Sequence, residues 1–239
     1  DALRTQNLIP KNEPYTANVG VTGTQFTHSG SGGGEKADST VVGSAAGTTG
    51  NNSIVDWVFV QLQASSGGAV VSTRAALLQR DGDIVDVDGV SPLNMAGNAP
   101  GNYFVSVRHR NHLGVRSASS VALSKTTATS YDFTTALTQA VANTANNQMA
   151  NVSGKFCMWG GNANSNSNVR YTGGGNDQNQ LLNICLGGNK NANLTNQYSS
   201  CDLNLNGRVN YTGGGNDQNV LLNTVLAGNK NIVISQATF

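Results

Sequence analysis

Two stretches of this chain carry oxygen-bearing side chains at every second position, the spacing with which a loop wraps around a hard metal ion. In the later stretch, Asp202, Asn204 and Asn206 occupy positions 1, 3 and 5, and Gly207 occupies position 6. Such donors, followed by a backbone carbonyl at position 7, are features of an EF-hand calcium loop. We therefore predict that this loop binds Ca²⁺, with the carbonyl of Arg208 as a further ligand.

The residue that would close this loop is displaced along the sequence. An EF-hand loop ends with a carboxylate at position 12, whereas positions 10 to 14 here are Tyr211, Thr212, Gly213, Gly214 and Gly215. Asp217 follows at position 16, and the glycines allow the backbone to fold the extra residues away. We expect Asp217 to complete the site while it begins a helix, where the helix dipole also favours an anion.

The same pattern occurs earlier, because Asn168–Lys190 repeats as Arg208–Lys230. The expected ligands of the earlier loop are Asn162, Asn164, Asn166, the carbonyl of Asn168, and Asp177. Only one of them is a carboxylate, so we predict that this loop binds calcium more weakly than the later loop, or holds no metal. The alternative for both loops is a pair of Asn- and Gly-rich turns without an ion.

An apolar stripe follows each loop and predicts a short helix. The stripes are Leu181, Leu182, Cys185 and Leu186 in the first repeat and Val220, Leu221, Val225 and Leu226 in the second. Asn216 or Asp217 can cap the second helix, and Gly228 can end it. Two helices this short cannot bury their apolar faces alone, so we expect them to pack against each other.

The region before the repeats has the pattern of β structure. Short apolar runs with period-two alternation, separated by turn signals such as Asp-Gly and Leu113-Gly114, predict a mainly β chain with an antiparallel β-sandwich, Ig-like or jelly-roll-like, over residues 53–133. The expected strands are 55–62, 70–78, 84–87, 103–110 and 126–133. Residues 134–151 are interpreted as a linker or a short helix, and residues 152–239 as the duplicated module.

Both ends of the chain could reach a neighbouring subunit. Residues 1–52 are Gly-rich and weakly patterned, which predicts an extended segment that could exchange a strand with a neighbour, and Tyr15–Thr27 could supply that strand. The tail Asn231–Phe239 alternates like a strand and could complete the sheet of another copy.

Composition excludes some functions. The net charge is +1 and only 11% of residues are charged, so no basic footprint points to nucleic acid. No apolar run reaches the length of a membrane span, so we expect no membrane insertion. Three cysteines cannot all pair within the chain. A Cys157–Cys201 disulfide is one possibility, with Cys185 as a small buried apolar residue.

Several long segments resemble a family of secreted Bacteroidota-type surface proteins, most of them uncharacterised. These segments include VDWVFVQL, ALLQRDGDIVDVDGVSP, GNYFVSVRHRNHLGV and SSCDLNLNGRVNYTGGGNDQNVLLN. The last part is similar to dockerin-type calcium repeats, in which both loops usually read D-x-N-x-D-G; here they read N-x-N-x-N-S and D-x-N-x-N-G. The resemblance implies an extracellular or cell-surface location and a dockerin-like module of two loop–helix repeats. It implies no activity.

Two other groups of polar residues could carry chemistry. The acidic run Asp81, Asp83, Asp86 and Asp88 could form a further calcium site or an acid/base pair, or could belong to an Asp-Gly hairpin with outward-pointing acids. The nearby segment 108–112 contains the basic residues Arg108, His109, Arg110 and His112. Their side chains could form salt bridges to the acidic run. A nucleophile motif of the GxSxG type is missing from the sequence.

These observations favour a secreted, calcium-stabilised structural protein that assembles with copies of itself into an extracellular filament or surface matrix. Strand exchange between subunits would give a helical polymer, and a cell-surface glycan is a further possible partner. The alternative is a dockerin-like binding or adhesion module that docks a protein or carbohydrate. A hydrolase that uses the acidic run or His109 is a third class, and we expect no enzymatic activity.

Overall fold

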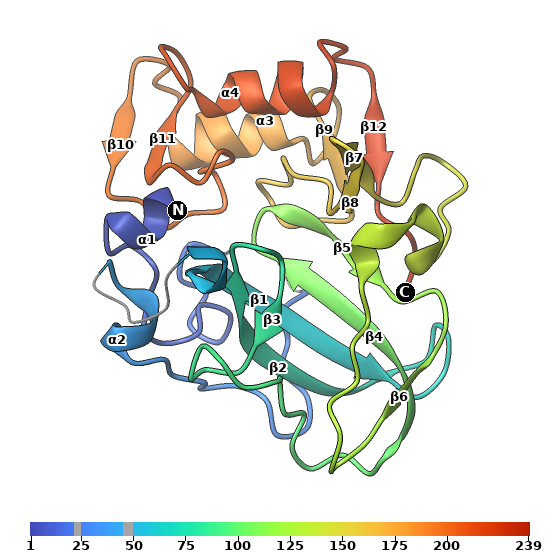
Figure 1. Ribbon diagram of the computed structural model, residues 1–239. Helices are drawn as coiled ribbons and strands as arrows, with labels where there is room; N and C mark the ends of the chain where they lie inside the picture. The colour runs from blue at the N-terminus through green and yellow to red at the C-terminus, as the bar shows by residue number, and fades with distance from the viewer. Residues whose placement is uncertain (22–24, 45–49) are drawn as a thin grey trace.

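The computed structural model describes residues 1–21, 25–44 and 50–239, and its main element is a six-stranded antiparallel sheet (Figure 1). The strand order is β3-β2-β1-β4-β5, and β6 pairs with the first residues of β4. The strands are β1 (Ile54–Gln63), β2 (Val70–Gln79), β3 (Ile84–Val85), β4 (Gly101–His109), β5 (His112–Arg116) and β6 (Val121–Leu123). The strands predicted over 55–62, 70–78 and 103–110 are confirmed as β1, β2 and β4.

The central strand β1 is buried on both faces, which explains its nearly continuous apolar run. Trp57 and Phe59 point to one face and pack with residues of the N-terminal segment. Val58 and Val60 point to the other face and pack with Ala140 and Met149 among others. The alternation of a strand therefore divides β1 between two separate apolar clusters, one on each side of the sheet.

The N-terminal segment covers the first face of the sheet. Leu3, Ile9, Tyr15, Phe26 and Val42 are buried in one cluster with the side chains of β1 and β2. The regular elements of its described part are the helices α1 (Ala2–Thr5) and α2 (Ser39–Val42) and the 3₁₀ turn η1 (Gly50–Asn52). The segment is thus a packed layer of this chain, largely without strands.

The strand expected over Tyr15–Thr27 is not formed by its described residues, which adopt turns. Burial of aromatic rings dominates here: Tyr15 stacks on Phe26, with the ring centroids 4.8 Å apart, and its hydroxyl donates to the carbonyl of Trp57 at 2.9 Å. The backbone N–H of Tyr15 is satisfied by the Glu13 carboxylate instead of a neighbouring strand. Residues 22–24 of the expected strand lie outside the described residues.

The second face of the sheet is covered by residues 133–158. This layer holds the 3₁₀ turns η2 (Phe133–Thr135) and η3 (Leu137–Gln139) and the hairpin of β7 (Ala150–Val152) and β8 (Lys155–Cys157). The strand predicted over 126–133 is wrong, because the chain leaves the sheet after β6 and Asp132 caps η2. The sheet therefore lies between two irregular layers, where the predicted sandwich would have placed a second sheet.

The duplicated module is built from two interlocked repeats. The first repeat contains β9 (Asn168–Arg170) and a helix formed by α3 (Asp177–Asn179) and η4 (Gln180–Cys185); the second contains β11 (Arg208–Asn210) and a helix formed by α4 (Asp217–Asn219) and η5 (Val220–Val225). After each helix a strand pairs with the other repeat: β10 (Asn193–Thr195) with β11, and β12 (Val233–Ser235) with β9. Figure 1 shows the two helices side by side at the top of the molecule.

The repeat helices begin and end as the sequence predicts. Asn216 is the cap of the second helix, and its side chain accepts the N–H of Asn219 at 2.8 Å. Each helix widens after its first turn, so that Leu226 N–H bonds to the Leu221 carbonyl five residues back. Gly228, with φ of +77°, then ends the second helix. The predicted packing of the apolar stripes is confirmed, since both stripes share one buried cluster.

Candidate metal centre

The loop that begins at Asp202 is curled by its own polar side chains. The Asp202 carboxylate accepts the N–H groups of Asn206 and Gly207 at 3.0 and 2.8 Å. Asn204 also accepts the Asn206 N–H, and the Asn206 side chain accepts the N–H of Arg208. These successive turns are made by side chains at positions 1, 3 and 5, as in a loop that wraps a cation.

The three glycines of each repeat return the backbone to this loop. In the second repeat the Gly215 carbonyl receives the side-chain amides of Asn204 and Asn206 at 2.7 and 3.5 Å. In the first repeat the Gly175 carbonyl receives those of Asn164 and Asn166 at 2.7 and 2.9 Å. Each loop thus gathers side chains of positions 3 and 5 around one backbone oxygen that the sequence did not identify.

Asp217 has a structural role that its sequence position did not show. Its carboxylate accepts the N–H of Leu203 at 2.7 Å and that of Asn210 at 2.9 Å, which ties the start of the loop to β11. In the first repeat Asp177 accepts the N–H groups of Asn164 and Arg170 in the same way. Both carboxylates are fully buried.

Burial makes these carboxylates costly to ionise. Burial raises the pKa of Asp217 and of Asp177 to about 7, even though the backbone N–H groups that they accept act in the opposite direction. Burial also raises the pKa of Asp202, and its charge contributes to the raised pKa of Asp217. Two buried carboxylates in one loop make each other's ionisation unfavourable. A divalent cation bound between them would offset this cost.

The second loop carries several oxygen-bearing side chains close together. Its side-chain donors are oxygens only, which is the set that Ca²⁺ prefers. At position 9, the side-chain oxygen of Asn210 is buried and has no hydrogen-bond partner, so one acceptor of this loop is left unused. Arg208, expected to give a backbone carbonyl, opens β11 opposite Thr195. Asp202, Asn204, Asn206, Asn210 and Asp217 are the residues that would hold the ion.

The first loop is a poorer fit because it contains its own cation. Arg170 occupies position 9, and its guanidinium donates to the Asn168 side chain at 2.6 Å and to the Gly174 carbonyl at 3.2 Å. Asn162, at position 1, uses its amide to bond the Asn166 carbonyl at 2.8 Å. A loop with one carboxylate and one guanidinium has little electrostatic attraction for a divalent ion.

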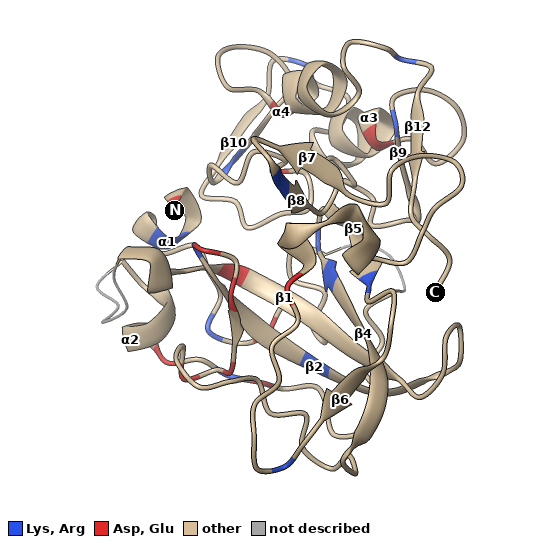
Figure 2. Cartoon of the chain, turned by 45° about the vertical axis from the view of Figure 1, so that its right-hand side comes forward, with Lys and Arg blue, Asp and Glu red and all other residues tan. Residues whose placement is uncertain are grey.

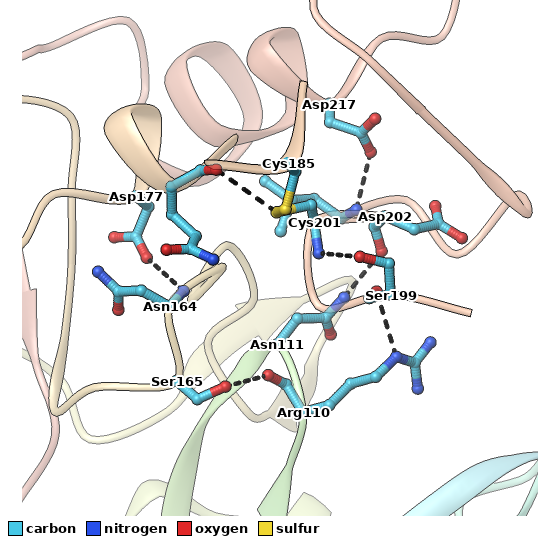
Figure 3. The surroundings of a disulfide bond; sticks show 12 residues. Arg110, Asn111, Asn164, Ser165, Asp177, Cys185, Ser199, Cys201, Asp202 and Asp217 are labelled. Carbon is cyan, nitrogen blue, oxygen red and sulfur yellow. Dashed lines mark hydrogen bonds between the residues drawn. A yellow bond between two sulfur atoms is a disulfide. The ribbon is translucent and has the colours of Figure 1, made fainter. Parts of the chain in front are cut away.

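The turn between β4 and β5 lies between the two loops (Figure 3). The Asn111 side chain donates to the Asp202 carbonyl at 2.8 Å, and its carbonyl accepts the N–H of Asn162 at 3.0 Å. Ser165 donates its hydroxyl to the Arg110 carbonyl at 2.7 Å. The first residue of each loop is therefore bonded to one turn of the sheet.

Beneath this turn lies a buried ionic network around Asp56. The Asp56 carboxylate bonds to Arg110 at 2.5 Å, to His109 at 3.1 Å and to the Tyr198 hydroxyl at 2.8 Å. Burial would raise the pKa of Asp56, but the charges of Arg110 and His109 outweigh it and hold that pKa well below its usual range. His112 contacts His109 through their Nδ1 atoms at 2.9 Å.

The predicted salt bridges between this basic cluster and the acidic run are wrong. Arg110 and His109 pair with Asp56, as described above, and Arg108 bonds to Gln61 and Gln25. The register of β4 explains this, because it pairs with β1, which carries Asp56 and Gln61. Charged residues are scattered over the chain in the view of Figure 2.

The acids of the run serve separate turns. Asp86 pairs with Arg74 at 2.7 Å, Asp88 accepts the N–H groups of Val90 and Ser91, and Asp81 accepts that of Asp83. Among the described residues, this run is not a cluster that could hold a metal ion. The hairpin interpretation of the run is the one that this geometry favours.

The cysteines pair differently from the expected alternative. Cys185 forms a disulfide with Cys201, whereas Cys157 is free and exposed. Because the two repeats pack as a pair, the helix of the first repeat lies against the start of the second loop, where Cys201 precedes Asp202. Cys185 is thus a cross-link between the repeats, and the prediction of a simple buried apolar residue is wrong.

In comparisons with known proteins, no protein-family model, no curated protein and no solved structure matches this chain. Within the described part of the chain, every helix is too short or too polar to cross a bilayer.

Proposed function

We propose that this chain is a secreted, calcium-stabilised structural protein that assembles with copies of itself into an extracellular filament or matrix. The observation that carries the proposal is the second loop. There Asp202 and Asp217 are buried in an oxygen-lined turn that is bonded to the sheet through Asn111. A Ca²⁺ ion at this loop would offset the charge of both carboxylates and hold the module against the sheet.

Each residue of the loop has a distinct task in this proposal. Asp202 supplies charge and curls the loop through the N–H groups of Asn206 and Gly207. Asn204 and Asn206 supply neutral oxygens, which their terminal amides can present after rotation. Asp217 supplies the second charge and fixes the distance between the loop and β11.

The disulfide supports an extracellular location. Disulfides form and persist in oxidising compartments and are rare in the cytosol. Cys185–Cys201 joins the two repeats next to the proposed calcium loop, and the resemblance of the sequence to secreted surface proteins points to the same location.

Strand exchange offers a route to self-assembly. The tail strand β12 pairs with β9 of the same chain, and the N–H of Gln236 bonds to the Ser167 carbonyl. The same pairing made with β9 of the next subunit would link copies head to tail, and such a contact does not close on itself. Val233 on this strand is 42% exposed.

Electron microscopy and sedimentation of the full chain, with calcium and with chelator, test this proposal. We expect fibres in calcium that dissociate when calcium is removed. Exchange repeats the β9–β12 contacts of the monomer, so a cross-link within one chain should block it. Val233→Cys with Arg170→Cys, which replaces residues opposite each other in that ladder, should stop fibre formation when oxidised, and Val233→Ser with Arg170→Ser is the matched control. Monomers alone at high protein concentration in calcium would refute self-assembly.

A dockerin-like binding module is the second candidate, because the two repeats make reciprocal contacts. Thr172 donates to the Lys230 carbonyl and Thr212 to the Lys190 carbonyl. These paired contacts relate the two repeats by an approximate twofold axis. The hydroxyl oxygens of the equivalent residues Tyr171 and Tyr211 lie 3.0 Å apart, close to that axis. Capture of a distinct protein or glycan by calcium-loaded monomers, without fibres, would favour this function.

A further inference from the structure

A second group of ligand-type side chains lies where the N-terminal segment packs on β2. Glu13, His28 and Glu35 each offer one ligand atom, and these atoms all lie within 4.8 Å of one another. Among the described residues, this is the group of His, Cys, Asp and Glu side chains with the proximity needed to hold a metal ion. Sequence spacing does not predict this group, since the three residues are spread over the Gly-rich N-terminal segment.

The Thr73 hydroxyl on β2 holds one nitrogen of the His28 ring. The Thr73 hydroxyl donates to the Ser29 carbonyl at 3.2 Å and accepts the Ser29 N–H at 2.8 Å. Nδ1 of His28 lies 3.1 Å from the same hydroxyl, a distance at which Nδ1–H can donate to it. In that neutral tautomer Nε2 carries a lone pair, the form in which histidine binds metals.

That lone pair faces an anionic oxygen with no hydrogen bond between them. Nε2 of His28 is buried and has no hydrogen-bond partner, and Oε2 of Glu13 lies 3.6 Å away. A 3.6 Å separation is too long for a hydrogen bond, whereas a cation between the two atoms would satisfy both.

We propose that Glu13, His28 and Glu35 bind a divalent transition-metal ion of the Zn²⁺ class. One imidazole nitrogen and two carboxylates are a donor set that zinc accepts, and neighbouring ligands of a tetrahedral zinc are about 3.3 Å apart. The Glu13–His28 pair, at 3.6 Å, is already near this spacing, and the ligand atom of the half-buried Glu35 lies within 4.8 Å of both. A hollow of about 720 Å³ beside His28 gives water access to the remaining coordination position.

The glycine run before Glu35 allows the ligands to come together. A Cβ atom on Gly32 would lie 2.1 Å from the Thr73 carbonyl oxygen, so only glycine permits this approach to β2. Gly33 has a φ of +106° and its Cβ would press on the His28 ring. The Glu13 N–H bonds to the Glu35 carbonyl at 3.0 Å and keeps the two acids opposite each other. An ion bound by Glu13, His28 and Glu35 would thus cross-link three separate parts of the N-terminal segment where it packs beside the sheet.

Calorimetric titration of the full chain with Zn²⁺ tests the site, in a background that blocks other metal ligands. Excess calcium competes with zinc for the oxygen ligands of the duplicated module, and Cys157→Ser removes the exposed thiol. Under these conditions we expect about one Zn²⁺ per chain and a rise in the unfolding temperature on zinc addition. Absence of stoichiometric zinc binding would overturn the proposal and leave His28 and Glu13 as an ion pair.

Two ligand variants locate the ion. His28→Gln and Glu35→Gln should each lower the zinc affinity at least about tenfold and abolish the zinc-dependent rise in unfolding temperature. Glu35 is half-buried, so its variant should keep the fold even if the His28 variant is unstable. Asp83→Asn, which changes an exposed acid outside the cluster, is the matched control. Zinc binding that is equally strong in both ligand variants would overturn the assignment.

Discussion

At the scale of single residues, the buried carboxylates of the repeats determine how the chain should respond to pH. The folded-state pKa values of Asp177 and Asp217 are raised to about 7, above the ordinary value of 3.8. Between these two values the folded chain binds more protons than the unfolded chain. Their contribution to stability is therefore present below about pH 4 and is lost as the pH rises through 7.

We predict that calcium prevents the decrease in stability at rising pH that Asp217 of the second loop causes. The free energy of unfolding, measured with urea from pH 5 to 8, should gain more from calcium at the alkaline end. Burial lowers the pKa values of His109 and His112, and these groups act with the opposite sign in the same window, whether or not calcium is present. Subtracting the free energy of unfolding in chelator from that in calcium, at each pH, leaves the contribution of the carboxylates of the loop. A difference that does not change with pH would contradict the prediction.

Position 9 of the loops should control their relative affinity for calcium. Arg170→Asn removes the guanidinium from the first loop and gives it the residue that the second loop has, so its calcium affinity should rise about tenfold. The reciprocal change Asn210→Arg should weaken the second loop by a similar factor. Calcium titration calorimetry of both variants checks this, and an Arg170→Asn chain that binds calcium as the parent does would count against the role of Arg170.

At the scale of elements, the sequence predicted what local pattern dictates and missed what distant packing decides. The strands β1, β2 and β4 and the repeat helices follow from apolar periodicity and from caps such as Asn216. The sequence pattern does not predict the strand β5, because Leu113-Gly114 resembles a turn signal. Gly114 instead lies in that strand, where Cβ would come within 3.1 Å of Arg108 and Gln236, so the glycine serves close packing.

For the candidate metal centre too, the sequence predicted only the part that is determined locally. The spacing of Asp202, Asn204 and Asn206 identified the curled loop, because side chains two residues apart act on neighbouring N–H groups. The contact of Asn111 with that loop joins residues 91 positions apart, and a single sequence carries no signal for such a pair. The same holds for the His28 cluster and for the partner of Cys185.

The disulfide between the repeats should make a large contribution to stability. Cys185 and Cys201 close a loop with a sequence separation of 16, for which the chain-entropy model gives about 3 kcal/mol. The double variant Cys185→Ser, Cys201→Ser should lose about that free energy of unfolding in urea. Cys157→Ser, which removes the free cysteine, should be close to neutral. A loss below about 1 kcal/mol in the double variant would mean that packing alone holds the repeats together.

Asn111 should couple the sheet to the second loop. Asn111→Ala leaves the buried Asp202 carbonyl without its side-chain donor, which should cost about 1 to 3 kcal/mol and lower the calcium affinity of the loop. The matched control is Asn98→Ala, which removes a bond to the Met95 carbonyl within one turn. Equal calcium affinity in the Asn111 variant and the parent would show that the loop is independent of the sheet.

At the scale of the whole molecule, the N-terminal layer, the sheet and the duplicated module are joined by packing and by hydrogen bonds. Leu3 and Tyr15 belong to the same buried cluster as Trp57 of the sheet, and the Gln6 side chain donates to the Asn206 carbonyl in the loop that begins at Asp202. An ion bound in that loop would therefore stabilise contacts with both other parts of the chain. For assembly, β12 must leave β9 of its own chain before it pairs with a neighbour, so exchange should be slow in the folded monomer.

The central claim, that the second loop holds calcium and thereby stabilises the chain, is tested most directly by thermal unfolding with calcium and with chelator. The parent should gain about 2.7 kcal/mol of stability at a calcium concentration one hundred times its dissociation constant. Asp217→Asn should lose most of the calcium-dependent gain, whatever its own stability, while the matched variant Asp177→Asn in the first loop should keep it. The same unfolding temperature for the parent in calcium and in chelator, or an undiminished gain in Asp217→Asn, would contradict the account.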